Sequence, residues 1–322
     1  MTRHITLGVF LVLTSGICQT AYPRQAPFAA ILGTAQDAGY PHAGCRKECC
    51  LEAWDNPGRR RMVSSLAIVD PITDERWIID ATPDFTGQLR LLEEIHPSPA
   101  KQTGTTSIAS TLGITGVILT HAHIGHYTGL MFLGKEGVGA ASVPVYAMPR
   151  MREFLGTNGP WSQLVSLNNI ALRPLEHGVR VLLNKRISIT PLLVPHRDEY
   201  SETIGLIIHG PNASLLFIPD IDKWEKWDTR LDDAVSRVDY ALLDGTFFED
   251  GEVPGRSMSE IPHPFITETL HRIAPLPPGT RNKVIFIHLN HTNPALREGS
   301  NATRQIENAG SRVGHQGEKF GL

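Results

Sequence analysis

The feature that most constrains the fold is a series of short apolar runs, rich in β-branched residues and separated by turn residues. These runs cover 28–34, 63–70, 76–82, 116–121, 143–148, 186–196, 203–210, 214–220, 240–246 and 283–289. Runs of this kind are typical of buried β-strands. Helix-like stretches fall between them, near 84–95, 126–134, 149–156, 230–236 and 262–273. Many strands with interspersed helices predict an α/β or α+β sandwich.

The length and charge of the chain limit the number of domains and the kinds of partner that we expect. It has 322 residues, of which 41% are hydrophobic and 20% charged, and it shows no internal repeat or low-complexity linker. This composition favours a globular protein with one large domain or two small ones. The net charge is −3, and the sequence has no basic stripe of the kind that nucleic-acid binding usually requires. A nucleic-acid partner is therefore not expected. The segment 97–110 and the polar tail after Arg297 should be the least ordered parts.

The first residues have the pattern of an export signal. A basic start is followed by an apolar core over 5–13 and then by small residues, which is too short to span a bilayer comfortably. We therefore expect a signal peptide over 1–21 and a single domain over 22–322. Lipidation of Cys18 is less favoured, because Ser15 stands where an apolar residue is needed. The mature protein is expected to be periplasmic or secreted, without stable membrane insertion.

Several apolar runs lead directly into a residue that can bind a metal. These residues are His121, His196, Asp220 and His288. Strand ends on a rigid scaffold can bring such side chains together at one edge. His123 and His126 follow closely in the stretch "HAHIGH". A single histidine at a strand end is usually an ordinary polar residue, but the whole set predicts a metal site.

This arrangement resembles the metallo-β-lactamase superfamily, whose second motif is His-x-His-x-Asp-His. Here the motif reads "HAHIGH", with Gly125 where the aspartate belongs. The later motifs match His196, Asp220 and His288, and Asp80 in "WIIDAT" matches the strand-end aspartate of the first motif. The resemblance implies an α+β fold, an αββα sandwich of two packed mixed β-sheets flanked by helices. It also implies a dinuclear metal site at one edge.

The same resemblance implies which residues bind each ion. The first ion would take His121, His123 and His196, the second His126 and His288, and Asp220 would bridge the two. Without an aspartate at position 125 the second site lacks an anionic ligand, so we expect weaker binding there. A Gly125→Asp variant should then raise its occupancy. Zinc is the expected metal, as one or two ions, with iron or manganese as alternatives.

Within the superfamily, the chain is similar to the coenzyme PQQ synthesis protein B group. The matching segments are "ILGTAQDAGYPHAGC", "LTHAHIGHYTGLM", "LLDGTFFED" followed by "IPHP", and "IHLNHTNP". This resemblance implies a part in the biosynthesis of pyrroloquinoline quinone, through oxidation of a tyrosine-derived precursor. The chain departs from the group in its cysteine pattern, which is C-x-x-x-C-C rather than C-x-C-x-x-C.

A second resemblance is to phosphodiesterases and tRNA-processing enzymes of the same fold. In those enzymes an acidic residue before "TF" and a later histidine protonate the leaving group. Asp244 in "DGTF" and His263 in "IPHP" stand in the corresponding order. A histidine oriented by a carboxylate suits general acid catalysis. The alternative is that His263 only caps the helix expected over 262–273.

Three cysteines cluster in "PHAGCRKECC", namely Cys45, Cys49 and Cys50. Three thiolates in a tight loop suit zinc, whereas the alternative is one disulfide with a free thiol. In some relatives with a cysteine loop, a histidine three residues past the last active-site ligand completes a structural zinc site. That resemblance implies His291 as the fourth ligand, with His42 as its rival.

We therefore predict a metal-dependent hydrolase that cleaves a small ester or phosphodiester with a metal-activated hydroxide. Its catalytic residues would be Asp220, His263 and Asp244. The alternatives are an iron-dependent oxidation in PQQ biosynthesis and a non-catalytic metal- or ligand-binding protein. The expected partner is a small-molecule substrate.

Overall fold

The computed structural model describes residues 26–98, 112–253, 255 and 257–322. The predicted signal peptide over 1–21 and most of the segment 97–110 lie outside the described residues. Among the residues that are described, no helix is long and apolar enough to cross a membrane.

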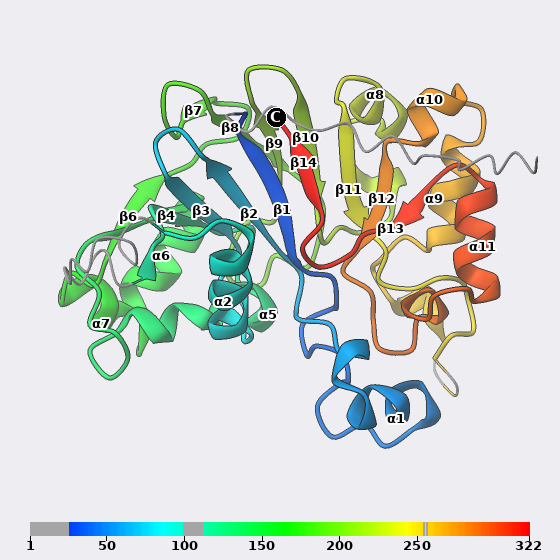
Figure 1. Ribbon diagram of the computed structural model, residues 1–322, viewed down its shortest axis with the longest axis horizontal. Coiled ribbons are helices and arrows are strands. Elements are labelled where there is room, and N and C mark those ends of the chain that lie inside the picture. Colours follow the sequence, from blue (N-terminus) through cyan, green and yellow to red (C-terminus); the bar gives the residue numbers. More distant parts are fainter. Residues whose placement is uncertain (1–25, 99–111, 254, 256) are drawn as a thin grey trace, which may run out of the picture.

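Two seven-stranded sheets pack face to face, and helices cover their outer faces (Figure 1). The first sheet has the spatial order β14 (Lys319–Gly321), β1 (Phe28–Gly33), β2 (Ser65–Asp70), β3 (Glu75–Ile79), β4 (Gly116–Ile118), β5 (Val143–Ala147) and β6 (Ile170–Pro174). The second has the order β13 (Arg312–Val313), β12 (Val284–Ile287), β11 (Tyr240–Asp244), β10 (Ser214–Ile218), β9 (Ile204–His209), β8 (Ser188–Leu193) and β7 (Val181–Leu182). Both sheets mix parallel and antiparallel pairs, which confirms the predicted αββα sandwich.

The helices fall into two outer layers and one separate lobe (Figure 1). The α-helices are α1 (Glu48–Asp55), α2 (Phe85–Ile95), α5 (Ile124–Tyr127), α6 (Pro149–Thr157), α7 (Trp161–Ser166), α8 (Leu231–Ser236), α9 (Ile266–Ile273), α10 (Pro278–Arg281) and α11 (Asn301–Asn308). Short 3-10 turns are η1 (Pro57–Arg59), η2 (Thr128–Leu133), η3 (Trp224–Lys226), η4 (Met258–Glu260) and η5 (Pro294–Leu296). Helix α1 belongs to the lobe that extends below the sandwich in Figure 1.

The apolar residues form three layers. One layer, including Ile68 and Phe217, lies between the sheets. A second packs Phe85 of α2 and other helical residues on the first sheet, and a third packs Ile273 of α9 and its neighbours on the second sheet. Because most strands are covered on both faces, they carry continuous apolar runs, and all six residues of β2 are buried.

Two helices differ from their predicted bounds. The helix expected over 262–273 begins only at Ile266, because Pro262 and Pro264 disfavour helical backbone in the residues before them. The helix expected over 126–134 is instead the short helix α5 followed by the 3-10 turn η2. Each predicted apolar run overlaps one strand.

The prediction of a poorly ordered tail after Arg297 was wrong. Helix α11 buries Ala302 and Ile306 on one face while its other residues are polar, so its apolar signal is weak. Strands β13 and β14 are only two and three residues long, yet they extend one sheet each by pairing with β12 and β1. The last residue, Leu322, is buried and donates its backbone N–H to Pro27 O.

Candidate metal centre

The residues expected to bind the first ion meet at one edge of the sandwich. Ligand atoms of His121, His123, His196 and Asp220 all lie within 4.8 Å of one another. His121 Nε2 lies 2.9 Å from His123 Nδ1 and 3.4 Å from Asp220 Oδ2, and His196 Nε2 lies 3.3 Å from Asp220 Oδ1. Three imidazoles and one carboxylate thus face a common point, and these are ligand types that zinc accepts.

A second group lies beside the first. It contains His126 and His288, as expected, together with Asp37, which sequence reasoning missed. Asp37 Oδ1 lies 3.2 Å from His126 Nε2 and 3.7 Å from His288 Nε2. Asp220 Oδ2 lies 3.9 and 4.0 Å from the same two nitrogens. Asp220 therefore lies between the two groups, in the bridging position that the resemblance implied.

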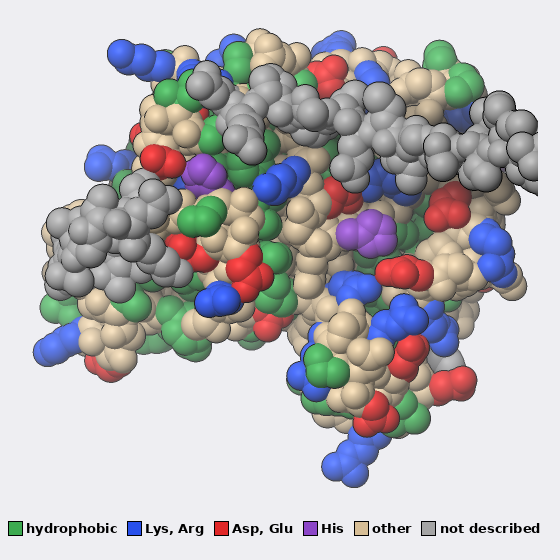
Figure 2. Space-filling view, in the orientation of Figure 1, with side chains coloured by type: hydrophobic (Ala, Val, Ile, Leu, Met, Phe, Trp, Pro, Cys, Tyr) green, Lys and Arg blue, Asp and Glu red, His purple; other side chains and the backbone are tan. Residues whose placement is uncertain are grey.

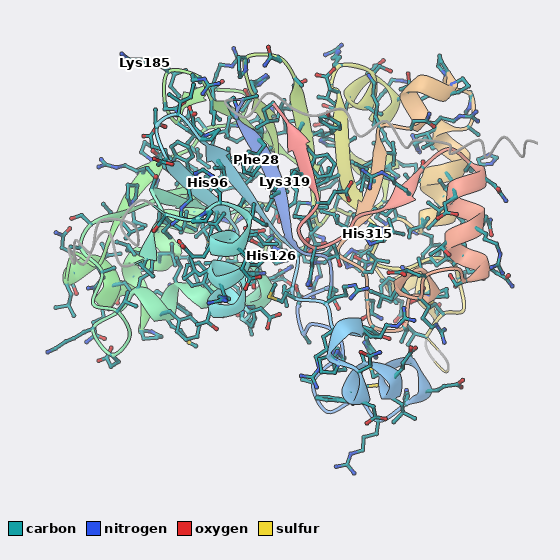
Figure 3. All side chains as sticks on the ribbon, in the orientation of Figure 1. Phe28, His96, His126, Lys185, His315 and Lys319 are labelled. Carbon is teal, nitrogen blue, oxygen red and sulfur yellow. The ribbon has the colours of Figure 1, made fainter. Side chains whose placement is uncertain are left out.

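Most of the centre is buried, while the side chains of His123 and Asp37 are 14% and 28% exposed. Figure 3 places His126 at the end of the sandwich where β1 leads toward the α1 lobe, and Figure 2 shows no histidine on the surface at that point. The side chains of His126 and His288 are fully buried, and that of Asp220 is 3% exposed. Such a dense set of polar groups, shielded from water, needs an internal partner.

Unpaired polar atoms identify that partner. Among the described residues, five inward-facing buried atoms have no hydrogen-bond partner: Asp37 Oδ1, His126 Nε2, His196 Nε2, Asp220 Oδ1 and His288 Nε2. Buried polar atoms are normally paired, and lone pairs that face each other repel. A divalent cation would accept all of these lone pairs at once. The imidazole and carboxylate donors suit zinc, iron or manganese.

The charges in the centre also favour a cation. Burial lowers the pKa of His126, but the nearby Asp80 and Asp37 outweigh it and hold that pKa well above its ordinary value. Burial raises the pKa of Asp220, but His196, His263 and His288 outweigh it and hold that pKa well below its ordinary value. The surroundings therefore attract positive charge, which a metal ion would supply.

A second set of contacts fixes the orientation of the imidazoles. His126 Nδ1 donates to Asp80 Oδ2 at 2.8 Å, so its Nε2 faces the centre. Thr120 donates both its backbone N–H and its hydroxyl to Asp80 and accepts from His121 Nδ1 at 3.0 Å. Asp80 thus lies behind the ligands rather than among them. His123 Nε2 contacts Glu199 Oε2 at 3.0 Å, which leaves its Nδ1 inward. Such outer contacts set the tautomer of a metal-binding histidine.

Asp244 and His263 lie against the same centre. His263 Nδ1 is 2.9 Å from Asp244 Oδ2 and 3.2 Å from Asp220 Oδ1. Burial lowers the pKa of His263, but Asp244 and Asp220 outweigh it and raise that pKa to about 9. His263 precedes helix α9, whose N-cap is Phe265, so the alternative of a helix-capping histidine is wrong. The structure thus places the His263 imidazole, with its raised pKa, next to the metal-binding cluster.

The cysteine cluster lies in the lobe that carries α1. The thiols of Cys45, Cys49 and Cys50 lie with a ring nitrogen of His291 within 4.8 Å of one another. The three cysteines are free, so the alternative of an internal disulfide is not what the structure shows. His42 is outside this group, although its ring centroid lies 4.3 Å from that of His291. The geometry fits a closed site of three sulfurs and one nitrogen.

The chain matches a known family and is similar to curated proteins over most of its length. The family model of the beta-lactamase superfamily domain matches residues 75–318. Coenzyme PQQ synthesis protein B from Nitrosococcus oceani is 28% identical over 316 residues, which cover 89% of this chain and 97% of that protein.

Solved structures agree with that match. Zn²⁺-bound PqqB from Methylobacterium extorquens is 23% identical with a TM-score of 0.75, covering 92% of this chain and 100% of that one. A diphosphatase from the PhnP family is 20% identical with a TM-score of 0.60, covering 92% of this chain and 97% of that one.

The predicted family and fold are confirmed by these matches. The similarity to the solved structures supports the fold, while the family model spans most of the chain. The chain belongs to the beta-lactamase superfamily domain family and has the metallo-β-lactamase fold.

Proposed function

We infer that the protein is a metal-dependent hydrolase of a small phosphodiester or ester. The observation that carries this proposal is the contact of His263 with both Asp244 and Asp220. It brings a potential proton donor to the carboxylate that lies between the two ligand groups. Hydrolysis of a phosphodiester needs both activated water and a proton for the leaving oxygen.

The metal ligands and the residues behind them have different roles in the proposed reaction. A metal ion bound by the cluster would lower the pKa of water and polarise the phosphoryl or carbonyl oxygen. His121, His123 and His196 would hold that ion, and Asp220 would fix its position relative to the second group. Glu199 and Thr120 keep the imidazoles oriented, so little reorganisation is needed during the reaction.

His263 supplies the proton. Asp244 is held by the backbone N–H groups of Ile221 and Thr246 and by the Thr246 hydroxyl, so it presents Oδ2 to His263 Nδ1 in a fixed direction. With Nδ1 engaged by carboxylates, Nε2 is the nitrogen left to donate to the leaving oxygen. The water oxygen bonds to the phosphorus or the acyl carbon as the bond to the leaving oxygen breaks. The alcohol takes its proton from His263, and the proton that the water loses restores His263 to its starting state.

A second candidate comes from the relatives named coenzyme PQQ synthesis protein B. An iron ion in the same cluster could support oxidation of a tyrosine-derived precursor of that coenzyme, with dioxygen as the oxidant. The same nitrogen and carboxylate donors accept iron as well as zinc. The requirement for dioxygen separates the two candidates.

The test compares leaving groups. Protein stripped of metal and reloaded with zinc, manganese or iron is assayed on bis(4-nitrophenyl) phosphate and on a phosphodiester with an alkyl leaving group. His263→Ala should slow the alkyl substrate by about 10²–10⁴-fold and the nitrophenyl substrate much less, because nitrophenolate leaves without a proton. His271→Ala, an exposed histidine on α9, is the matched control and should retain activity. Absence of ester or phosphodiester hydrolysis with every metal, together with dioxygen-dependent oxidation of a tyrosine-containing peptide, would overturn the proposal.

A further inference from the structure

We propose that Asp37 replaces the aspartate missing from position 125 and completes a second metal site with His126 and His288. The proposal concerns the same centre as the proposed hydrolase. It is a statement about metal binding, so it can be tested without a substrate.

The first argument is steric. A Cβ atom placed on Gly125 would lie 2.2 Å from Asp37 Oδ1 and 2.7 Å from both Cγ and Cα of Asp37. The Asp37 carboxylate therefore occupies the space in which a side chain at position 125 would begin. With the present backbone, position 125 has no room for a side chain, because even the Cα atom of Asp37 lies too close to it. The glycine in "HAHIGH" makes room for a carboxylate from another part of the chain.

The second argument is the support given to Asp37 by the backbone. Leu289 N donates to Thr34 O at 2.8 Å, and Gln36 N donates to Leu289 O at 2.9 Å. These bonds fasten the segment before Asp37 to the residue that follows His288. Gly39 N then donates to Gln36 O at 2.8 Å and closes a turn around Asp37. Asp37 and His288 are thus held by neighbouring backbone, which fixes their separation.

The third argument is chemical. Gln36 Nε2 donates to Asp37 Oδ2 at 3.3 Å, whereas Oδ1 faces His126 and His288 without a hydrogen-bond partner. A carboxylate oxygen aimed at two imidazole nitrogens is a ready ligand for a divalent ion. Asp220 Oδ2, within 4.0 Å of both nitrogens, adds a second carboxylate.

This site reverses an expectation drawn from the sequence. The second group does not lack an anionic oxygen, because Asp37 provides one. Gly125→Asp should accordingly lower the occupancy of the second site instead of raising it, since the new side chain would displace Asp37.

The experiment counts metal ions per chain after loading with Mn²⁺ and removal of free metal. Asp37→Asn keeps the size of the side chain and should lose one ion relative to the unaltered protein. Gly125→Asp should lose the same ion. Asp233→Asn, an exposed carboxylate on α8, is the matched control and should bind as many ions as the unaltered protein.

Electron paramagnetic resonance gives an independent readout. Two manganese ions sharing Asp220 should show magnetic coupling in the unaltered protein, and no coupling should be seen in Asp37→Asn. A full complement of coupled ions in Asp37→Asn would overturn the proposal, as would a gain of metal in Gly125→Asp alone. If the metal counts follow the expected pattern while no ester or phosphodiester is hydrolysed, the proposed function fails and this inference stands.

Discussion

The carboxyl group of Glu252 provides a quantitative test of the structure near the centre. Glu252 accepts hydrogen bonds from the backbone N–H of Phe248 and from the hydroxyl of Thr292. It therefore ties the segment after Thr246 to the turn that carries His291. Burial raises the pKa of Glu252 from its usual 4.5 to about 7, against the opposing effect of these two hydrogen bonds.

The sign and size of the effect follow from that pKa. The folded protein holds the proton on Glu252 more tightly than the unfolded chain does. The resulting stability is fully present below pH 4.5 and is lost as the pH rises through about 7. The difference in pKa corresponds to a change of about 3 kcal/mol in the free energy of unfolding. This is an upper bound, because Glu252 is only partly buried and water screens part of the effect. In a protein of this size, a loss of that order lowers the melting temperature by roughly 5 °C.

Glu252→Gln removes the titration and keeps the shape of the side chain. Melting temperatures are measured by calorimetry with the metal content held constant. The melting temperature of this variant should rise relative to that of the unaltered protein as the pH increases from 5 to 8. Glu307→Gln, at an exposed position on α11, is the control and should follow the unaltered protein throughout. A constant difference between Glu252→Gln and the unaltered protein over this range would refute the reasoning.

Further predictions concern the two metal-binding regions and the N-terminus. Cys49→Ser should lower both the zinc content and the melting temperature, since a closed tetrahedral site contributes directly to folding; unchanged values would rule out the structural site. His121→Ala should remove the ion of the first group and any activity, whereas His96→Ala should leave both intact. Asp80→Ala should weaken metal binding by about 10–100-fold in a titration, because His126 would lose its orienting partner. Mass spectrometry of the exported protein should find an N-terminus near residues 19–22, and an intact Met1 in the cytoplasm would contradict the proposed export.

Much of the centre could be predicted because its ligands follow apolar strands directly. His121, His196, Asp220 and His288 each stand within a few residues of a strand end, where a sheet can hold a side chain in place. Their convergence depends only on strand order and direction. The superfamily motif then added His123 and His126 from the local spacing.

Asp37 could not be found by the same reasoning. It stands four residues past the end of β1, in a turn whose position depends on backbone hydrogen bonds to Leu289, far away in the chain. The sequence reveals that Gly125 lacks a side chain, but not which residue fills the space. A search for acidic residues shortly after every strand would have included Asp37 among several candidates.

The C-terminal tail was mispredicted for a related reason. Its strands β13 and β14 are short edge strands, and their stability comes from pairing with β12 and β1 rather than from their own composition. Helix α11 carries few apolar residues, and Ala302 and Ile306, four residues apart, share the face that packs on the second sheet.

The most direct test of the metal centre is anomalous X-ray diffraction from crystals of the zinc-loaded protein at the zinc absorption edge. The account predicts a strong peak among His121, His123, His196 and Asp220, with ligand distances of about 2.0–2.2 Å. It predicts a second peak among Asp37, His126, His288 and Asp220. Fully loaded crystals with anomalous density at the cysteine cluster and none among these histidines would contradict it.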